Sequence, residues 1–172
     1  MRLRPYIHSK DYNYIYNWIT DERTHALWCA NMIPYPMTEE NFLSVLEKDA
    51  ADWGGCAYVA TANDGTLLGF FVLSVNVINN SGFLKFVILN NELRGKGYGT
   101  QKVKLIQKYA FEIAGVSSIQ LNVFDVNIIA RKCYARNGFT EDSFTGNAFT
   151  FHDECWGRCH MVVSKVNGGG QE

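Results

Sequence analysis

The sequence contains no long apolar run, and no stretch of its 172 residues approaches the 18 or so consecutive apolar residues of a membrane-spanning helix. Residues 1–6 lead directly into polar sequence, without the apolar segment of a secretory signal peptide. An excess of charge is also missing, since 16 lysines and arginines stand against 17 aspartates and glutamates. We therefore expect a cytoplasmic protein whose partners are neither membranes nor nucleic acids.

The cysteine content does not suit a disulfide framework. The five cysteines form an odd set in a chain of this size, which indicates reduced thiols and agrees with the cytoplasm. Apolar residues make up 47% of the sequence, enough for a full core and too many for a disordered chain. The length suits one domain, which we assign to residues 1–167, and residues 168–172 are expected to form a flexible glycine-rich tail.

Helical periodicity marks several parts of the chain. Apolar side chains recur at helical spacing in four segments, which are residues 10–19, the stretch after Thr38, residues 99–114 and residues 127–137. Ser9 and Thr38 are suitable N-caps for the first two, because their hydroxyl groups can accept a free N–H of the first turn. Residues 21–29 are compatible with either a short helix or a loop.

Strand-like composition marks the rest. Six segments are rich in β-branched, aromatic and other apolar residues, namely 56–61, 67–78, 83–89, 118–124, 139–144 and 155–166. The first three form an antiparallel meander, and the last two form a hairpin around a loop at residues 145–147. The fourth follows a helix, so it is parallel to the third with a right-handed crossover. These elements predict an α/β domain with a mixed, twisted sheet of six or seven strands and about four flanking helices.

A glycine-rich turn stands between the strand at residues 83–89 and the next helix. In residues 94–100, Arg-Gly-Lys-Gly-Tyr-Gly-Thr, three glycines at alternate positions leave the backbone free where the first unpaired N–H groups of a helix point outward. Such a turn is typical of an anion cradle. A P-loop is excluded because Lys96 lies between the glycines, and a dinucleotide fingerprint is excluded because Thr100 or Lys102 stands where its third glycine is required.

Two motifs carry a resemblance to a known family. The pattern Arg94-x-x-Gly97-x-Gly99 after a strand resembles the acetyl-CoA pyrophosphate loop of the GNAT family of N-acetyltransferases. About 30 residues later, Asn127, Ala130 and Tyr134, followed by Gly-Phe at 138–139, are similar to the second hallmark of that family. The resemblance covers residues 67–139. The first 55 residues resemble, more loosely, the branch of ribosomal-protein N-terminal acetyltransferases and their small-molecule relatives.

The resemblance implies a single GNAT-like domain in which the central parallel strands splay apart. The exposed backbone of the strand before the glycine loop then pairs with the pantetheine arm of acetyl-CoA, and one N–H near Leu89 polarises the thioester carbonyl. Lys96 either adds a cation near the pyrophosphate or is simply solvated. The implied acetyl-CoA ligands are Val87, Leu89, Arg94, Gly95, Lys96, Gly97, Gly99, Thr100 and Asn127.

The family also implies a mechanism, in which an amine attacks acetyl-CoA directly in a ternary complex. Tyr134 is expected to protonate the leaving thiolate; its alternative role is that of a buried core tyrosine. An acyl-enzyme on the neighbouring Cys133 fits the family mechanism less well. The family often places a basic glutamate on the strand before the loop, where this sequence has only Lys85. Glu92 and Asp125 lie nearby, but we assign no general base, and ordered water relayed by backbone carbonyls is the alternative.

The acceptor is the part of the reaction about which the sequence says least. Trp28 and Tyr35, two members of an aromatic N-terminal cluster that is chiefly core, are expected to line the acceptor pocket. An acidic group either attracts a cationic amine or forms a solvated face; it comprises Glu39, Glu40, Glu47, Asp49 and Asp52. A protein N-terminus and a free polyamine or antibiotic amine both remain open as acceptors, and the chain could act as a homodimer.

Two other functions are compatible with parts of the sequence. The first is a non-catalytic domain that binds or senses acyl-CoA, against which Tyr134 argues. The second is a metal site formed by His152, Cys155, Cys159 and His160. Their spacing is not that of a zinc site, and a strand would spread them over two faces, so no metal is expected.

Overall fold

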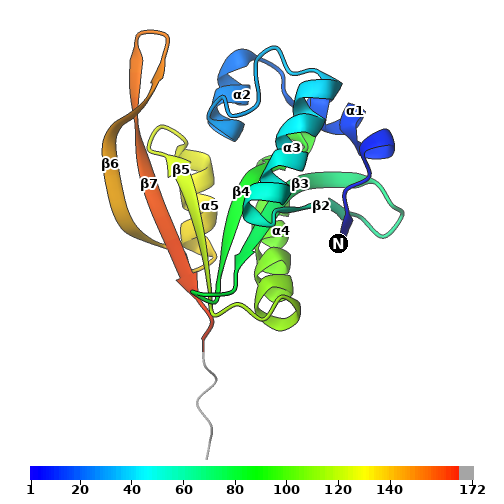
Figure 1. Ribbon diagram of the computed structural model, residues 1–172, viewed down its shortest axis with the longest axis vertical. Helices are drawn as coiled ribbons and strands as arrows, with labels where there is room; N and C mark the ends of the chain where they lie inside the picture. Colours follow the sequence, from blue (N-terminus) through cyan, green and yellow to red (C-terminus); the bar gives the residue numbers. More distant parts are fainter. Residues whose placement is uncertain (167–172) are drawn as a thin grey trace, which may run out of the picture.

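The computed structural model describes residues 1–166, so the boundary expected at residue 167 and the glycine-rich tail lie outside the described residues. Seven strands form one mixed sheet in the order β1-β2-β3-β4-β5-β7-β6 (Figure 1). The strands are β1 (Arg2–Pro5), β2 (Cys56–Thr61), β3 (Leu67–Asn76), β4 (Ser81–Leu89), β5 (Ser118–Phe124), β6 (Thr140–Phe151) and β7 (Glu154–Ser164). The helices are α1 (His8–Trp18), α2 (Glu22–Cys29), α3 (Glu39–Trp53), α4 (Tyr98–Lys108) and α5 (Ile128–Arg136). None of these helices has the length and apolar character needed to span a membrane.

The expected mixed sheet is confirmed, and the described chain has five α-helices where about four were expected. The additional helix is α2, which the sequence left open between helix and loop; Asp21 caps it by accepting the Thr24 N–H at 2.8 Å. Ser9 is not the cap of α1, because the helix already begins at His8. The Ile7 N–H instead donates to the buried carboxylate of Asp11 at 2.8 Å, which makes a hydroxyl cap unnecessary.

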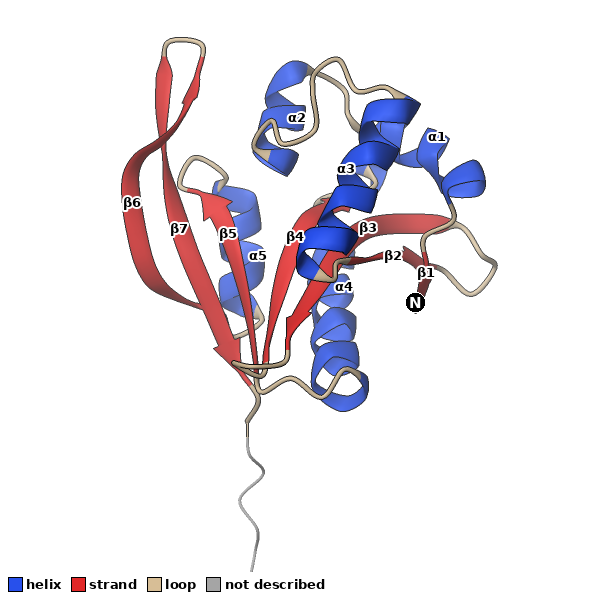
Figure 2. Cartoon of the chain, in the orientation of Figure 1, coloured by secondary structure: helices blue, strands red, loops and turns tan. Residues whose placement is uncertain are grey.

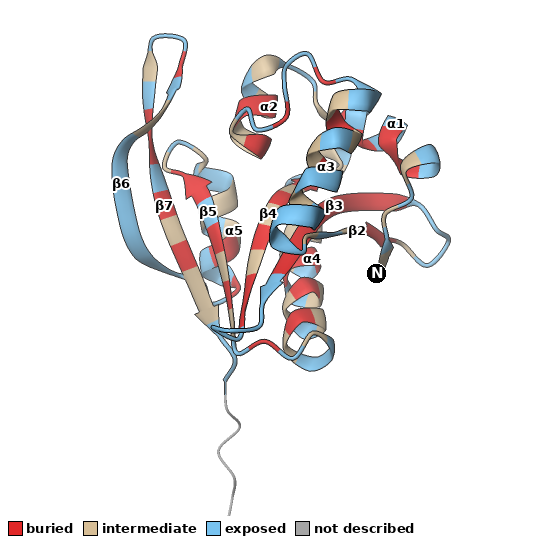
Figure 3. Ribbon diagram, in the orientation of Figure 1, coloured by how far each residue is buried: buried red, intermediate tan, exposed pale blue. Residues whose placement is uncertain are grey.

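Helices cover both faces of the sheet (Figure 2). Phe70 and Val72 of β3 belong to a core shared with α1, α2 and α3, whereas Phe71 and Leu73 belong to a second core shared with α4 and α5. Successive strand residues point to opposite faces, so a strand covered on both sides must be apolar throughout. This explains the continuous buried run at the centre of the sheet (Figure 3).

The parallel strands β4 and β5 separate partway along their length. Their pairing runs from Ser81 opposite Ser118 to Leu84 opposite Leu121 and then stops, although β4 continues to Leu89 and β5 to Phe124. Figure 1 shows the two strands diverging toward α2. The expected splayed pair is therefore present, and it leaves the end of β4 without a neighbour on that side.

A β-bulge lies where β4 leaves its neighbour. Val72 of β3 pairs with Lys85 and Phe70 pairs with Ile88, so a single β3 residue faces both Phe86 and Val87. Phe86 has a φ angle of 49°, a left-handed conformation that is strained for a bulky residue. A bulge bends its strand and increases the local twist, which helps to open the gap from β5.

The prediction of a hairpin loop at residues 145–147 is wrong. Those residues belong to β6, and the hairpin turns instead at residues 152–153, where His152 has a φ angle of 51°. Asn147, with a φ angle of 49°, lies in an irregularity of the β6–β7 register, so its tolerance of the left-handed region serves a bulge and not a turn. The extended hairpin reaches α2, where Arg23 forms an ion pair with Glu154.

Candidate functional site

A cavity of about 420 Å³ occupies the opening between the diverging ends of β4 and β5. Its walls come from residues 83–87 of β4, residues 122–124 of β5, α2 with the loop after it, the start of α5, and the β6–β7 hairpin. These segments are distant in sequence and meet only because the parallel pair splays and the hairpin reaches α2. The cavity is thus the candidate site, and each expected residue can be placed relative to it.

The backbone of the last β4 residues faces this opening. Asn90 donates its N–H to the Leu68 carbonyl at 2.9 Å, and Ile88 pairs with Phe70, so both residues direct their backbone groups toward β3. Antiparallel strands alternate in this respect, so the N–H and C=O of Leu89 point away from β3 and toward the opening. Val87 has no paired residue in β3 or β5 within residues 1–166.

The glycine turn is open and uncapped. Gly95 and Gly97 have φ angles of 75° and 83°, which side chains rarely adopt, and a Cβ atom at either position would have no other atom within 4 Å. Gly97 is the N-cap of α4 and makes no side-chain hydrogen bond, so the first N–H groups of the helix are free to bind an anion. Arg94 and Lys96 are exposed and form no ion pair with the described residues.

The third glycine has a different role, which is close packing. A Cβ atom at Gly99 would lie 3.4 Å from the Cys133 sulfur, so this position brings α4 close to α5. Thr100, in the first turn of α4, is half-buried. The turn therefore connects the anion cradle directly to the helix that carries Tyr134.

Tyr134 is a buried residue of α5 that lines the cavity, and 8% of its surface is exposed. Its ring packs edge-on against Phe139 at 5.5 Å, and its hydroxyl makes no hydrogen bond with any described residue. Burial raises the pKa of the Tyr134 phenol above its ordinary value of 10, so the group keeps its proton at neutral pH. The side chain of Asn127, which also lines the cavity, caps α5 by accepting the Ala130 N–H at 3.2 Å.

Of the two expected acceptor residues, the structure brings only Trp28 to the cavity. Tyr35 lies outside its wall, 48% exposed, with its ring 5.1 Å from that of His25. Phe149 and Arg158 of the β6–β7 hairpin line the cavity but were not predicted as site residues. Phe149 follows the predicted loop, whereas Arg158 lies in the predicted strand 155–166, whose position beside the cavity the sequence did not indicate. No local pattern distinguishes them from other strand residues.

The acidic group of the N-terminal half divides into two parts. Glu39, Glu40, Glu47 and Asp52 are exposed and form a solvated face. Asp49 turns inward and forms a largely buried ion pair with Lys85, whose side chain reaches the cavity. The structure therefore explains Lys85 as a paired cation of the wall.

The other carboxylates considered as a base lie elsewhere. Glu92 is exposed in the short 3₁₀ turn Asn91–Leu93. Asp125 accepts the N–H groups of Val126 at 2.8 Å and Gly157 at 2.9 Å, so it braces the turn after β5. Among the described residues, no aspartate or glutamate lines the cavity, and no three metal-ligating side chains gather in one place.

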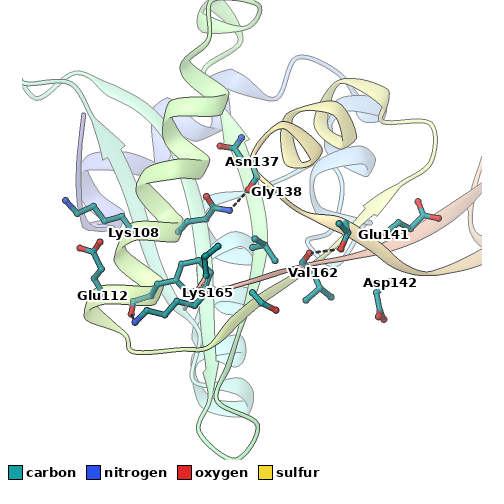
Figure 4. A pocket seen from close by; sticks show the side chains of 14 residues that line it. Lys108, Glu112, Asn137, Gly138, Glu141, Asp142, Val162 and Lys165 are labelled. Carbon is teal, nitrogen blue, oxygen red and sulfur yellow. Dashed lines mark hydrogen bonds between the residues drawn. The ribbon is translucent and has the colours of Figure 1, made fainter. Parts of the chain in front are cut away.

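A second hollow, of about 820 Å³, lies between the end of α4 and the end of β7 (Figure 4). Its lining mixes charges of both signs, including Lys108, Glu112 and Lys165. None of the expected acetyl-CoA ligands and neither acceptor residue lies on its wall. Its polar contacts are structural, such as the Gln107 side-chain amide that donates to the Asn137 carbonyl at 2.7 Å.

Sequence comparisons agree with this arrangement. The profile of the acetyltransferase (GNAT) family matches residues 12–139, which contain both motifs and most of the cavity wall. An uncharacterised N-acetyltransferase of Methanocaldococcus jannaschii is 35% identical over 86 residues, which are 50% of this chain and 53% of that protein. The chain thus spans about half the length of this curated relative.

Solved structures share the fold over almost the whole chain. The spermidine N-acetyltransferase of Vibrio cholerae, in complex with CoA and spermine, superposes with a TM-score of 0.81 at 21% identity, covering 95% of this chain and 94% of that one. A mutant form of the same enzyme gives a TM-score of 0.77 at 20% identity, with 95% of each chain covered. The family profile covers most of the cavity wall and the whole glycine turn, and the chain belongs to the acetyltransferase (GNAT) family.

Proposed function

We propose that this protein transfers the acetyl group of acetyl-CoA to a primary amine by direct attack in a ternary complex. The observation that carries the proposal is the opening between β4 and β5, which has the buried phenol of Tyr134 on its wall and the free backbone edge of β4 on one side. The same strand leads through residues 90–93 to the anion cradle at the start of α4. Family membership supports the same reaction.

The residues present fit acetyl-CoA. The open glycine turn and uncapped start of α4 suit the pyrophosphate, with the N–H groups of residues 95–100 as donors and Arg94 and Lys96 as nearby cations. The free backbone of Val87 and Leu89 suits the pantetheine arm, which would pair with it as an added strand. The amide of Asn127, at the cavity wall, is a further donor for that arm.

When bound, acetyl-CoA supplies a thioester, whose acetyl carbon is the electrophile and whose sulfur is the leaving group. The Leu89 N–H polarises the thioester carbonyl as the amine nitrogen forms its bond to carbon. Tyr134 donates its proton to the sulfur as the carbon–sulfur bond breaks, and it then recovers a proton from water. Because burial raises the pKa of this phenol, it is protonated at neutral pH and holds the proton that the leaving thiolate needs.

The positions of the side chains around the cavity bear on two further questions: what removes the proton of the attacking amine, and whether the Cys133 thiol acts as a nucleophile. Because no carboxylate of the described residues lines the cavity, we propose that water relayed by backbone carbonyls removes the proton of the attacking amine. The Cys133 thiol packs near Gly99 at the start of α4 and does not line the cavity, which argues against an acyl-cysteine intermediate.

Release of CoA thiol in the presence of amine and peptide acceptors tests this function. We expect release that depends on both acetyl-CoA and an acceptor. Tight binding of acetyl-CoA without release for any acceptor would instead identify a sensing domain.

For the acceptor, the charges of the cavity wall are informative. The wall contains two cations, Lys85 and Arg158, and no carboxylate from the described residues. Lys85 is neutralised by Asp49, whereas Arg158 is exposed and makes no hydrogen bond or ion pair with the described chain. The Vibrio cholerae relative acts on spermidine, a polycation, which this wall would repel. We therefore propose an acceptor amine whose body is apolar or carries an anionic group.

An acceptor panel with an Arg158→Gln variant checks this proposal. For an amine that bears a carboxylate, loss of one charge-assisted hydrogen bond should raise KM about tenfold and leave kcat little changed. Arg136→Gln, which removes an exposed arginine outside the cavity wall, is the matched control. Spermidine as the best acceptor, with no effect of Arg158→Gln on any amine, would contradict this acceptor class.

A further inference from the structure

Lys102 is a buried amine that the proposed mechanism does not use. It lies in α4, 2% of its surface is exposed, and its Nζ donates to the Ile88 carbonyl of β4 at 2.6 Å. Unlike buried Asp11, which pairs with Arg4, Lys102 forms no ion pair with the described residues. It occupies the core-facing stripe of α4, four residues before Ile106.

The fold leaves space for this side chain. A Cβ atom at Gly69 of β3 would lie 2.8 Å from the Ile88 oxygen, 2.9 Å from Lys102 Cδ and 3.1 Å from Lys102 Nζ. Contacts below 3 Å do not occur for real Cβ atoms, so glycine at position 69 permits the lysine to reach the carbonyl. The contact therefore depends on β3, β4 and α4 together.

The geometry of one peptide unit connects this contact to the cavity. In a trans peptide, the C=O of one residue and the N–H of the next point in opposite directions. The Ile88 carbonyl faces β3 and Lys102, so the Leu89 N–H in the same plane faces the opening. This N–H is the group proposed above to polarise the thioester.

We propose that Lys102 is a positioning residue for acetyl transfer, which holds the Ile88–Leu89 peptide so that the Leu89 N–H is aimed into the opening and polarised. The inference rests on the proposed function. A donor on a carbonyl oxygen strengthens the hydrogen bond that the attached N–H can give, because linked hydrogen bonds polarise one another. Lys102 acts from behind the strand, since its side chain is not part of the cavity wall.

The charge of Lys102 should make the polarisation of the Ile88–Leu89 peptide depend on pH. The pKa of Lys102 is lowered to about 7, chiefly because the amine is buried; Cys133 of α5 opposes this lowering, and the nearby Arg94 adds to it. No titratable side chain faces it from β3 or β4, where its neighbours are Gly69 and Ile88. The amine can donate in both protonation states, but the ammonium, which prevails as the pH falls below about 7, polarises the peptide more strongly.

The effect of Lys102 protonation on the Leu89 N–H can be measured in the wild-type chain by NMR. In the wild-type chain, we expect its ¹⁵N chemical shift to titrate with a midpoint near the pKa of Lys102, about 7. The titration should disappear in Lys102→Met and persist in Cys133→Ser, which removes the other nearby titratable group. A Leu89 amide that stays constant while the Lys102 side chain itself titrates would overturn the proposal.

The pH dependence of kcat is the second measurement that tests the role of Lys102. We expect the wild-type kcat to exceed that of Lys102→Met about tenfold at pH 6 and the ratio to shrink toward pH 9, as the wild-type lysine loses its charge. Ile106→Val, which alters the same core stripe of α4, is the control and should leave kcat unchanged at every pH. A ratio that does not change with pH would overturn the positioning role alone. Absence of CoA release by the wild-type chain would overturn the proposed function and, with it, the positioning role of Lys102.

Discussion

Replacing Tyr134 with phenylalanine is expected to lower kcat by about 10²- to 10⁴-fold, the usual contribution of a positioned general acid. The ring would keep its place against Phe139, so the cavity wall and the affinity for acetyl-CoA should change little. The physical reason is that the leaving thiolate would lose its only buried phenolic donor in the cavity wall of the described chain. Steady-state rates of thiol release and a binding isotherm for acetyl-CoA measure the two quantities separately.

The control for this variant is Tyr109→Phe. Tyr109 packs against the same core as Tyr134, its hydroxyl is 2.7 Å from that of Tyr58, and it does not line the cavity. Its loss should cost about 1 kcal/mol of stability, as for a typical hydrogen bond, without an effect on kcat. If Tyr134→Phe turned over as fast as the wild type, the general acid would have to be another group or water.

A Gly97→Ala substitution should weaken acetyl-CoA binding by about 10- to 100-fold. The φ angle of 83° would cost a side chain roughly 1–3 kcal/mol, and a backbone that relaxes to avoid this cost moves the N–H groups of the cradle. About 1.4 kcal/mol corresponds to a factor of ten in affinity. Isothermal titration with acetyl-CoA measures the effect.

Gly65→Ala separates strain from binding. Gly65 has a φ angle of 91° and, like Gly97, open space around its Cβ position, but it lies in the turn between β2 and β3. This control should lose comparable stability in urea unfolding and keep the wild-type affinity. Equal affinities for Gly97→Ala and the wild type would remove the turn from the acetyl-CoA site.

Backbone groups and side chains have different proposed roles in this site. The cradle and the β4 edge are proposed to bind through N–H and C=O groups, so the backbone conformation at Gly97 and the Leu89 groups that point away from β3 matter more than the side chains of their neighbours. For the acetyl-transfer step itself, the proposed side chains are Tyr134 at the leaving group and Lys102 behind the peptide. The hairpin and α2 form the remaining wall, where Arg158 is proposed to select the acceptor.

The sequence by itself determined the local parts of the site. A glycine turn before a helix, and an asparagine that caps the helix carrying Tyr134, depend on a few consecutive residues, so spacing alone located both motifs and the family. Lys102 could have been noticed in the same way, as a charged residue on the apolar stripe of α4.

Only the tertiary structure decided the rest of the cavity. The positive φ of Phe86, the contact from Lys102 to Ile88 and the pairing of Asp49 with Lys85 depend on register and packing between distant segments. Local propensity misplaced the turn of the last hairpin, whose aromatic residues pack against α2 across a register irregularity near residue 147. Arg158 lies in a predicted strand, and only the fold brings it to the cavity. These features depend on contacts between segments that are distant in sequence, and the periodicity of a single segment carries no information about such contacts.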